Sequence, residues 1–302
     1  MNDQALLSAR LQKEYQNEMG RRATVHRQNV ARLNSAETSA RNLAVAVSNR
    51  PLVLLAQGDS WFDYPIKGNG PIWGDTDIIA HLRRMGSMPP TILNLAFSGG
   101  TAVELMSLSR QTTLIEQLQN QSNWPRGKPD AILFSAGGND IAGEEFCIFL
   151  DFNDGKSNGL NMDRFSRALA MVEACYLSLF AIRDRISPGT PVFSHCYDIP
   201  VPNGSHPFCA GPWLKPSLDY CNWSVSDGTR IVREALGAFR NMLMSLEEDK
   251  KNNFHLVQTQ GTLASNDWAN ELHPFEEGFE RLAALFDDAL RTHFSGRPLS
   301  IR

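Results

Sequence analysis

Ser60 and His273 are the residues of this chain whose types and surroundings best suit nucleophilic catalysis. Ser60 follows a short apolar run, and Gly58 just before it allows the backbone to turn sharply and present the serine. His273 precedes Pro274 and a final amphipathic segment, so we expect it at a helix entry rather than on an apolar face. Serine attacks esters well when a histidine takes its proton. Gly-Asp-Ser is also an ordinary turn sequence, so this tripeptide alone does not establish an enzyme.

Two further glycine turns follow apolar runs in the same manner. Gly99-Gly100 comes after one run, and Gly137-Gly138 followed by Asn139 comes after the next. Glycines at such points allow a backbone amide to approach a ligand with no side chain in the way. The alternative for the first of them is a plain helix-entry turn. Three successive runs therefore deliver small turns and polar groups that could meet at one place.

The elements that would position these groups alternate along the chain from residue 51 onward. Apolarity without alternation is typical of strands covered on both faces, and it occurs at residues 52–56, 92–96, 131–134, 191–194 and 254–257. Helix-like stretches lie near 75–86, 101–120, 161–186, 226–249 and 275–294. This alternation predicts an α/β fold, a three-layer αβα sandwich around a central, mostly parallel five-stranded sheet.

Two segments interrupt the alternation and follow strand ends, where open α/β sheets place their ligands. Residues 62–74 are rich in glycine, proline and aromatic residues, and the prolines of 197–223 are expected to exclude regular structure. Their aromatic residues either form an apolar acyl pocket or a sugar-stacking platform, or simply pack the loops onto the sheet. They are Phe62, Tyr64 and Trp73 in the first segment and Phe208, Trp213 and Trp223 in the second.

Residues 1–48 are expected to form a helical arm on a catalytic domain that spans 49–302. The arm has no proline and places apolar side chains every four residues, at Leu7, Leu11, Tyr15 and Met19. It is too polar to form a core alone, so it lies on the body, pairs with a second copy to form a homo-oligomer, or frays. We expect it to contribute to stability or to oligomerisation and to leave the chemistry unaffected.

The composition is that of a globular protein with 42% hydrophobic and 21% charged residues. Residues 1–50 carry a formal charge of +4 and the remainder −8, and no block of like charge is dense enough to predict nucleic-acid binding. The start of the chain lacks the pattern of a signal peptide, and no run of eighteen apolar residues predicts a membrane span. Five cysteines without metal-ligand spacing leave at least one thiol unpaired in a monomer. We therefore predict a cytoplasmic protein without a metal site.

Taken together, four blocks of this sequence resemble those of the SGNH, or GDSL-type, hydrolases. The blocks are Gly58-Asp59-Ser60, Gly99 after Asn94, Gly137-Gly138-Asn139-Asp140 and His273-Pro274, in family order between residues 57 and 279. The resemblance implies that Ser60 is the nucleophile and His273 its base. It also implies that the oxyanion is stabilised by the amides of Ser60 and Gly99 and by the side chain of Asn139. Around them we expect a substrate site that includes Asp59, Trp61, Tyr64, Gly138 and Trp213.

Asn270 marks a departure from the family pattern, which usually has Asp three residues before the histidine. An amide oxygen can still accept the imidazole N–H and fix its tautomer, although it brings no charge to stabilise imidazolium. Asp267, Glu271 or a backbone carbonyl could take this part instead. We predict a Ser-His dyad oriented by Asn270.

The function expected from these features is that of a serine esterase. It would hydrolyse a small-molecule, lipid or carbohydrate ester through an acyl-enzyme, with no cofactor. Two alternatives remain open at this point. The acyl group could pass to an alcohol in place of water, making the protein an acyltransferase, or the chain could be a non-catalytic binding protein on a degenerate SGNH fold.

Overall fold

The computed structural model of the chain describes residues 3–42, 50–65, 76–205 and 211–295. At its centre is a five-stranded sheet in which every neighbouring pair of strands is parallel, in the order β2-β1-β3-β4-β5. The strands are β1 (Val53–Gly58), β2 (Thr91–Asn94), β3 (Ala131–Ser135), β4 (Val192–His195) and β5 (Phe254–Val257). Nearly every strand residue is buried, which is why the runs are continuously apolar. The predicted sheet is confirmed.

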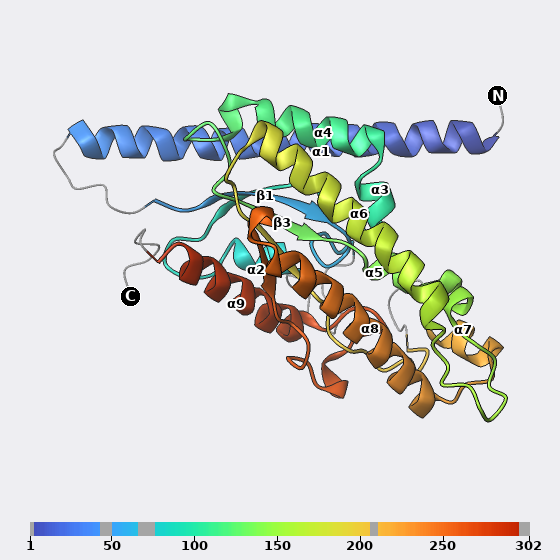
Figure 1. Cartoon of the computed structure of the whole chain (residues 1–302). Coiled ribbons are helices and arrows are strands. Elements are labelled where there is room, and N and C mark those ends of the chain that lie inside the picture. Colours follow the sequence, from blue (N-terminus) through green and yellow to red (C-terminus); the bar gives the residue numbers. More distant parts are fainter. Residues whose placement is uncertain (1–2, 43–49, 66–75, 206–210, 296–302) are drawn as a thin grey trace.

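Helices cover both faces of this sheet and complete the predicted three-layer sandwich (Figure 1). One face carries α3 (Ala102–Leu105), α4 (Leu108–Gln119), α6 (Met162–Ile186) and α8 (Val225–Glu248), and the other carries α2 (Ile78–Leu82) and α9 (Glu276–His293). The chain moves from β1 to β2 in one direction and then runs back across β1 to β3, β4 and β5. Because such crossovers are right-handed, the reversal of direction places the helices that connect β2 to β3, β3 to β4 and β4 to β5 on the face opposite α2.

Shorter elements connect these layers. They are α5 (Gly138–Ile141), α7 (Lys215–Tyr220), and the 3-10 turns η1 (Gln121–Asn123), η2 (Glu144–Phe149), η3 (Lys250–Asn252) and η4 (Ser265–Asp267). Cys175, Cys196 and Cys221 are buried free thiols, in line with the expected unpaired cysteine.

Two details of the predicted elements are wrong. The stretch 101–120 is two helices, because each has its own start: the Thr101 side chain caps α3 in a capping box with Glu104, and α4 begins after Ser107. In the loop 197–223, prolines do not exclude helix, since α7 carries Pro216 in its first turn, where the missing N–H is not needed.

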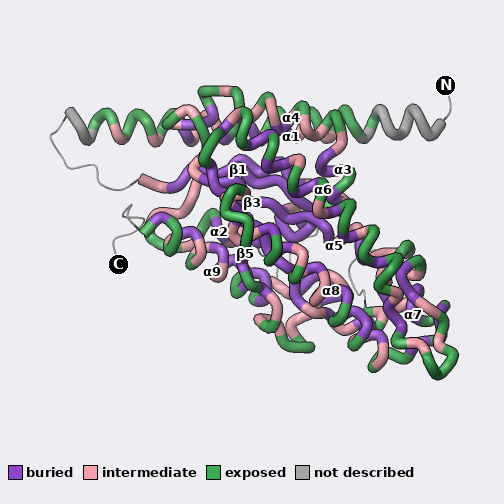
Figure 2. Tube along the Cα trace, in the orientation of Figure 1, coloured by how far each residue is buried: buried purple, intermediate pink, exposed green. Residues whose placement is uncertain are grey.

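Helix α6 is long and apolar enough to cross a membrane by length and composition alone, although charged residues interrupt its apolar sequence. In the structure it contacts α3, α4 and α8, and its inward face is buried in the core, with Phe165, Val172, Tyr176 and Leu179 at most 1% exposed. Burial of this inward face accounts for part of the apolar composition, since 44% of the apolar window lies inside the molecule and Figure 2 shows α6 with both buried and exposed segments.

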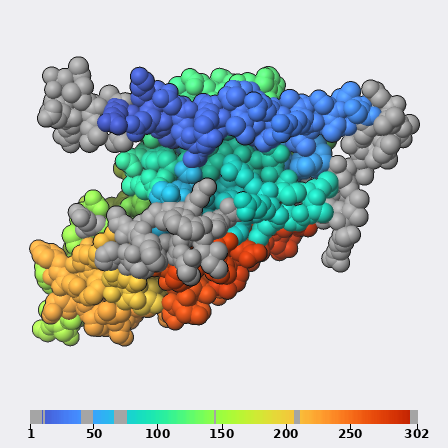
Figure 3. Space-filling model, turned by 180° about the vertical axis from the view of Figure 1, so that it is seen from behind, coloured from blue at the N-terminus to red at the C-terminus, as the bar shows by residue number. Residues whose placement is uncertain are grey.

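The arm forms one helix, α1 (Asp3–Asn42), that lies along the edge of the sheet beside β2 (Figures 1 and 3). Its inner face carries Met19, Ala23, His26 and Val30, all buried, at the alternating spacing of four and three residues that keeps them on one side of a helix. Leu7 and Leu11 are outside the residues whose side chains are described. The arm therefore lies on the body of the protein, as one of the alternatives expected; its pairing with a second copy stays a prediction.

Candidate active site

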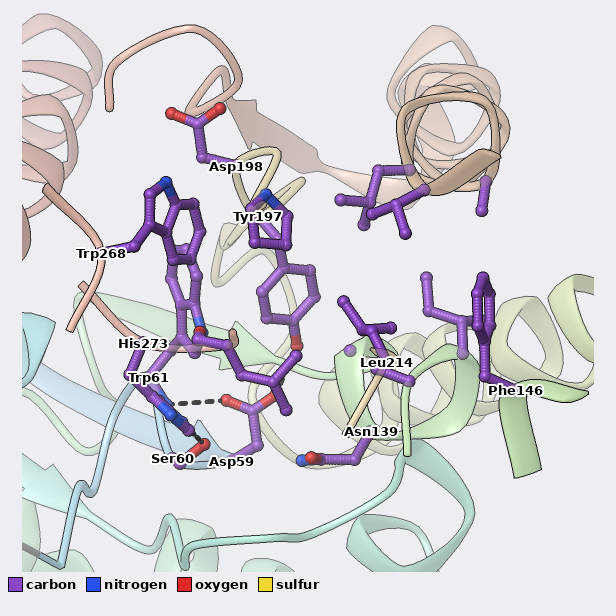
Figure 4. Close-up of a pocket in the computed structure, with 18 residues that line it drawn as sticks. Asp59, Ser60, Trp61, Asn139, Phe146, Tyr197, Asp198, Leu214, Trp268 and His273 are labelled. Carbon is purple, nitrogen blue, oxygen red and sulfur yellow. Dashed lines mark hydrogen bonds between the residues drawn. The ribbon is translucent and has the colours of Figure 1, made fainter. Parts of the chain in front are cut away.

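The candidate site lies at the carboxyl ends of β1 and β3, where the strand order reverses. Ser60 follows β1, and Gly138 and Asn139 open α5 directly after β3. The connections that follow these two neighbouring strands leave in opposite directions. A crevice therefore opens between the strand ends, because no loop crosses from one to the other. The resulting pocket contains Ser60, Asn139 and His273 (Figure 4).

Ser60, His273 and Asn270 form a continuous hydrogen-bonded chain. The Oγ of Ser60 lies 2.7 Å from Nε2 of His273, and Nδ1 of His273 lies 3.1 Å from Oδ1 of Asn270. With the proton on Nδ1, that nitrogen donates to Asn270 and Nε2 is left to accept from the serine hydroxyl. The arrangement is that of a nucleophile, a base and an acceptor that orients the base.

Asn270 is fixed by its own backbone turn. Its Oδ1 also accepts the N–H groups of Leu272 and His273, each at 2.9 Å, and its Nδ2 donates to the hydroxyl of Tyr64 at 3.3 Å. The residue is 2% exposed. These bonds leave the amide one orientation, with its oxygen toward the imidazole.

The imidazole of His273 is held neutral by its surroundings. It is 5% exposed, with the ring of Tyr64 centred 4.4 Å away and that of Trp213 5.9 Å away. Burial disfavours the charged form and lowers the pKa of His273 to about 3. The resting base is therefore unprotonated near neutral pH.

The two carboxylates considered as alternatives to Asn270 have other partners. Asp267 pairs with Arg281 at 2.6 Å. Glu271, only 1% exposed, points away from the histidine into the loop that follows β4. Its two oxygens accept four backbone N–H groups at 2.7 to 3.1 Å, those of Gly204, Trp213, Leu214 and Lys215. Glu271 thus orders the pocket wall that contains Leu214.

The predicted oxyanion donors do not all line the pocket. Asn139 does, and its Nδ2 donates to the Gly100 carbonyl at 3.0 Å, which leaves its second amide hydrogen for a ligand. Gly99 lies just outside on an exposed turn with φ +78°. Among the described residues, none accepts a hydrogen bond from the N–H of Ser60 or of Gly99.

A buried polar network supports the nucleophile turn from below. Asp59 accepts from the N–H of Trp61 at 3.0 Å, from Ser135 Oγ at 2.7 Å and from the Tyr197 hydroxyl. Ser135 also meets Nε2 of His195 at 2.8 Å. Burial raises the pKa of Asp59 to about 6. Both carboxylate oxygens of Asp59 thus accept hydrogen bonds from the protein, although Asp59 borders the pocket.

Residues 54–286 match the sequence profile of the family described as GDSL-like Lipase/Acylhydrolase. The chain belongs to this family. It is accordingly a hydrolase of ester bonds. Comparison with curated proteins gives no match.

Solved structures of lipases resemble this GDSL-like hydrolase at low sequence identity. The lipase Lip_vut3 from a goat rumen metagenome is 16% identical, with 79% of this chain and 97% of that chain covered and a TM-score of 0.53. An extracellular lipase from Streptomyces rimosus is 14% identical over 79% of this chain and 99% of its own, with a TM-score of 0.47. The first of these likenesses supports the shared fold.

The remaining predicted substrate-site residues of this GDSL-like hydrolase serve as walls. Trp61 is buried, donates to the Leu272 carbonyl at 3.0 Å and stacks on His195. Gly138 lies so close to Tyr197 that a Cβ would come within 2.7 Å of its ring. Of the other loop aromatics, Phe62 and Trp223 pack in the core, while Trp73 and Phe208 lie outside the described residues.

The far wall of the pocket was missed from the sequence. It is formed by apolar side chains from the segment after β3 and from α8, together with Leu214. They are Ile141, Phe146, Leu214, Val232, Ala235 and Leu236. In Figure 4, Ser60 and His273 are at one end of the pocket and Phe146 at the other. The helical spacing of apolar residues in α8 predicts that one face of the helix is buried. Such residues ordinarily pack in the core, so the spacing does not distinguish a pocket wall from core packing.

Proposed function

We propose that this protein hydrolyses carboxylic esters with an apolar acyl group through an acyl-enzyme on Ser60. The observation that carries the proposal is the chain of contacts from Ser60 Oγ to His273 Nε2, at 2.7 Å, and from His273 Nδ1 to Asn270 Oδ1, at 3.1 Å. The position of these residues at one end of a mostly apolar pocket supports the choice of substrate.

The reaction proceeds in two balanced steps. Ser60 Oγ attacks the ester carbonyl carbon while its proton passes to Nε2 of His273, and the same proton then goes to the departing alcohol. Water next attacks the acyl-serine, gives its proton to His273 and releases the acid as Ser60 regains a proton. Nδ1 of His273 keeps its hydrogen bond to Asn270 throughout.

Charge stabilisation must come chiefly from the oxyanion side, because Asn270 supplies no negative charge for the imidazolium. Asn139 contributes its free amide hydrogen, and Ser60 and Gly99 contribute their backbone N–H groups. Removing a single donor of this kind typically lowers turnover by about 10²–10³.

The acyl preference follows from the pocket wall beyond the nucleophile. A hydrocarbon chain buried against Phe146, Leu214 and Ala235 is removed from water, with a gain of about 0.8 kcal/mol for each CH₂. A sugar or other polar acyl group would have to give up hydrogen bonds to water at an apolar wall.

The test is hydrolysis of p-nitrophenyl esters from acetyl to dodecanoyl by wild type, Ser60→Ala and His273→Ala. We expect kcat/KM to rise with chain length in wild type and to fall by about 10⁴-fold or more in both variants, with the double variant no worse than either. Ser109→Ala, a change at an exposed serine of α4, is the matched control. A fluorophosphonate probe should label wild type and Ser109→Ala but not Ser60→Ala. Substantial hydrolysis by purified Ser60→Ala would refute the proposal.

A further inference from the structure

The guanidinium of Arg22, in the middle of α1, reaches the strand end that leads to Gly99. Its Nη1 donates to two carbonyls at the end of β2, those of Asn94 at 3.3 Å and of Ala96 at 3.1 Å. β2 is an edge strand, so its outward carbonyls have no neighbouring strand to satisfy them. Arg22 supplies donors that a further strand would otherwise provide.

The same guanidinium also binds the turn that carries the nucleophile. Its Nη2 contacts both carboxylate oxygens of Asp63, at 2.9 and 3.0 Å. Asp63 lies three residues after Ser60, and its N–H closes this turn by donating to the Asp59 carbonyl at 3.1 Å. One side chain therefore joins the turn of Ser60 to the segment before Gly99.

Neighbouring contacts make this junction rigid. The Tyr15 hydroxyl, also on α1, donates to the Leu95 carbonyl at 3.2 Å, so α1 holds three consecutive carbonyls. Asn94 adds a second tie to the nucleophile turn, from its Nδ2 to the Phe62 carbonyl at 2.7 Å. The side chain of Arg22 is 19% exposed, which limits the screening of its ion pair by solvent.

We propose that Arg22 is a positioning residue for the hydrolytic reaction, and that α1 is thereby part of the active-site framework. By fixing the distance between the turn of Ser60 and the segment that leads to Gly99, Arg22 sets the geometry of nucleophile and oxyanion donor. The proposal rests on the function proposed above. It extends the machinery to a residue outside the family match at 54–286 and departs from the expectation that the arm leaves the chemistry unaffected.

The matched control is Arg21, the adjacent residue of α1. Both arginines bind Glu18, but the side chain of Arg21 is 67% exposed and its hydrogen bonds go only to Glu18, within the helix. Arg21→Ala and Arg22→Ala thus each remove one positive charge and one ion pair with Glu18 within the helix. Only the second also removes the junction between the two catalytic segments.

The experiment measures kcat and KM for a p-nitrophenyl ester in full-length wild type, Arg21→Ala, Arg22→Ala, Arg22→Lys and Asp63→Asn. Active sites are counted by fluorophosphonate titration, and kcat is expressed per titrated site. We expect Arg22→Ala to lower kcat by about 10- to 100-fold with KM nearly unchanged, because small misplacements of reacting groups have effects of this size. Arg22→Lys and Asp63→Asn should give intermediate losses, and Arg21→Ala none.

Equal kcat per titrated site in Arg22→Ala and Arg21→Ala would overturn the inference, as would a change confined to KM or to the melting temperature. If Arg22→Ala does not fold, Arg22→Lys and Asp63→Asn decide by the same criterion. If wild type hydrolyses the ester and is labelled at Ser60 while the Arg22 variants are unaffected, only this inference is refuted. Wild type without labelling removes the proposed function itself.

Discussion

Replacing Asn270 with Asp would place a carboxylate where a neutral amide now holds the catalytic histidine. Oδ1 of Asn270 already accepts three N–H groups, all of which a carboxylate oxygen can accept equally well. The Nδ2 of Asn270, a donor, is replaced by a carboxylate oxygen, an acceptor, so the Tyr64 hydroxyl must rotate to donate to it. The substitution therefore adds a negative charge about 3 Å from the imidazole with little change in shape.

The main effect expected is on the pKa of His273. Burial now lowers this pKa to about 3, and an opposite charge at hydrogen-bond distance favours imidazolium by about 1–3 pKa units. Each unit corresponds to about 1.4 kcal/mol. The pKa of His273 should therefore rise to about 4–6, which still leaves the free base dominant at pH 7. The transition state contains imidazolium, so a charge that stabilises imidazolium should raise kcat at pH 7. The increase is about tenfold for each pKa unit of stabilisation that is fully present in the transition state.

The assay is the pH dependence of kcat/KM for wild type, Asn270→Asp, Asn270→Ala and Asp267→Asn, with folding checked by circular dichroism. The base works only when unprotonated, so a higher pKa moves the acid limb of the profile to higher pH in Asn270→Asp. Asn270→Ala should lower kcat, since three donors lose their acceptor. Asp267→Asn should leave the limb in place, because Asp267 pairs with Arg281. A loss of activity in Asn270→Asp with an unmoved acid limb would refute the reasoning, as would a large loss in Asp267→Asn.

Three further predictions concern the pocket. Asn139→Ala should lower kcat by about 10²–10³ with little change in KM, whereas a defect mainly in KM would assign Asn139 to substrate binding. Glu271→Gln replaces one of the two carboxylate oxygens with an NH₂ group that faces backbone N–H donors. The melting temperature should therefore fall, and KM for long-chain esters should rise because the pocket wall at Leu214 is held less firmly. Unchanged values of both would contradict this structural role. Ala235→Trp should reduce kcat/KM for octanoyl but not acetyl esters, and equal effects on both would remove Ala235 from the acyl path.

The sheet and the elements of the site were predictable from the sequence because their signals are local. A strand buried on both faces must be apolar at every position, and each of the five runs shows this without reference to its neighbours. Glycine turns after β1, β2 and β3 are likewise visible in the chain, and parallel strands bring their carboxyl ends to one edge. That topology brings Ser60 and Asn139 to one pocket, whereas His273 reaches it from the segment between β5 and α9.

The partner of His273 was decided only by tertiary structure. Asp267, Asn270 and Glu271 are all close to the histidine in sequence, and charge alone favours the two carboxylates. The turn at 270–273 directs the Asn270 oxygen to the imidazole, while four backbone N–H groups from a distant loop draw Glu271 the other way. Side-chain direction in irregular segments depends on such long-range contacts, which residue spacing does not encode.

The contribution of the arm has the same origin. Spacing every four residues predicted a helix with an apolar face, and α1 is that helix. Its polar Arg22, unremarkable in the sequence, meets Asp63 and two strand-end carbonyls only because α1 lies against the open edge of β2. Local pattern thus determined the strands and the longer helices, although it missed α7 and the break between α3 and α4. Which polar side chains act together was set by the packing of segments far apart in the chain, where burial makes each unpaired group costly and so selects one arrangement.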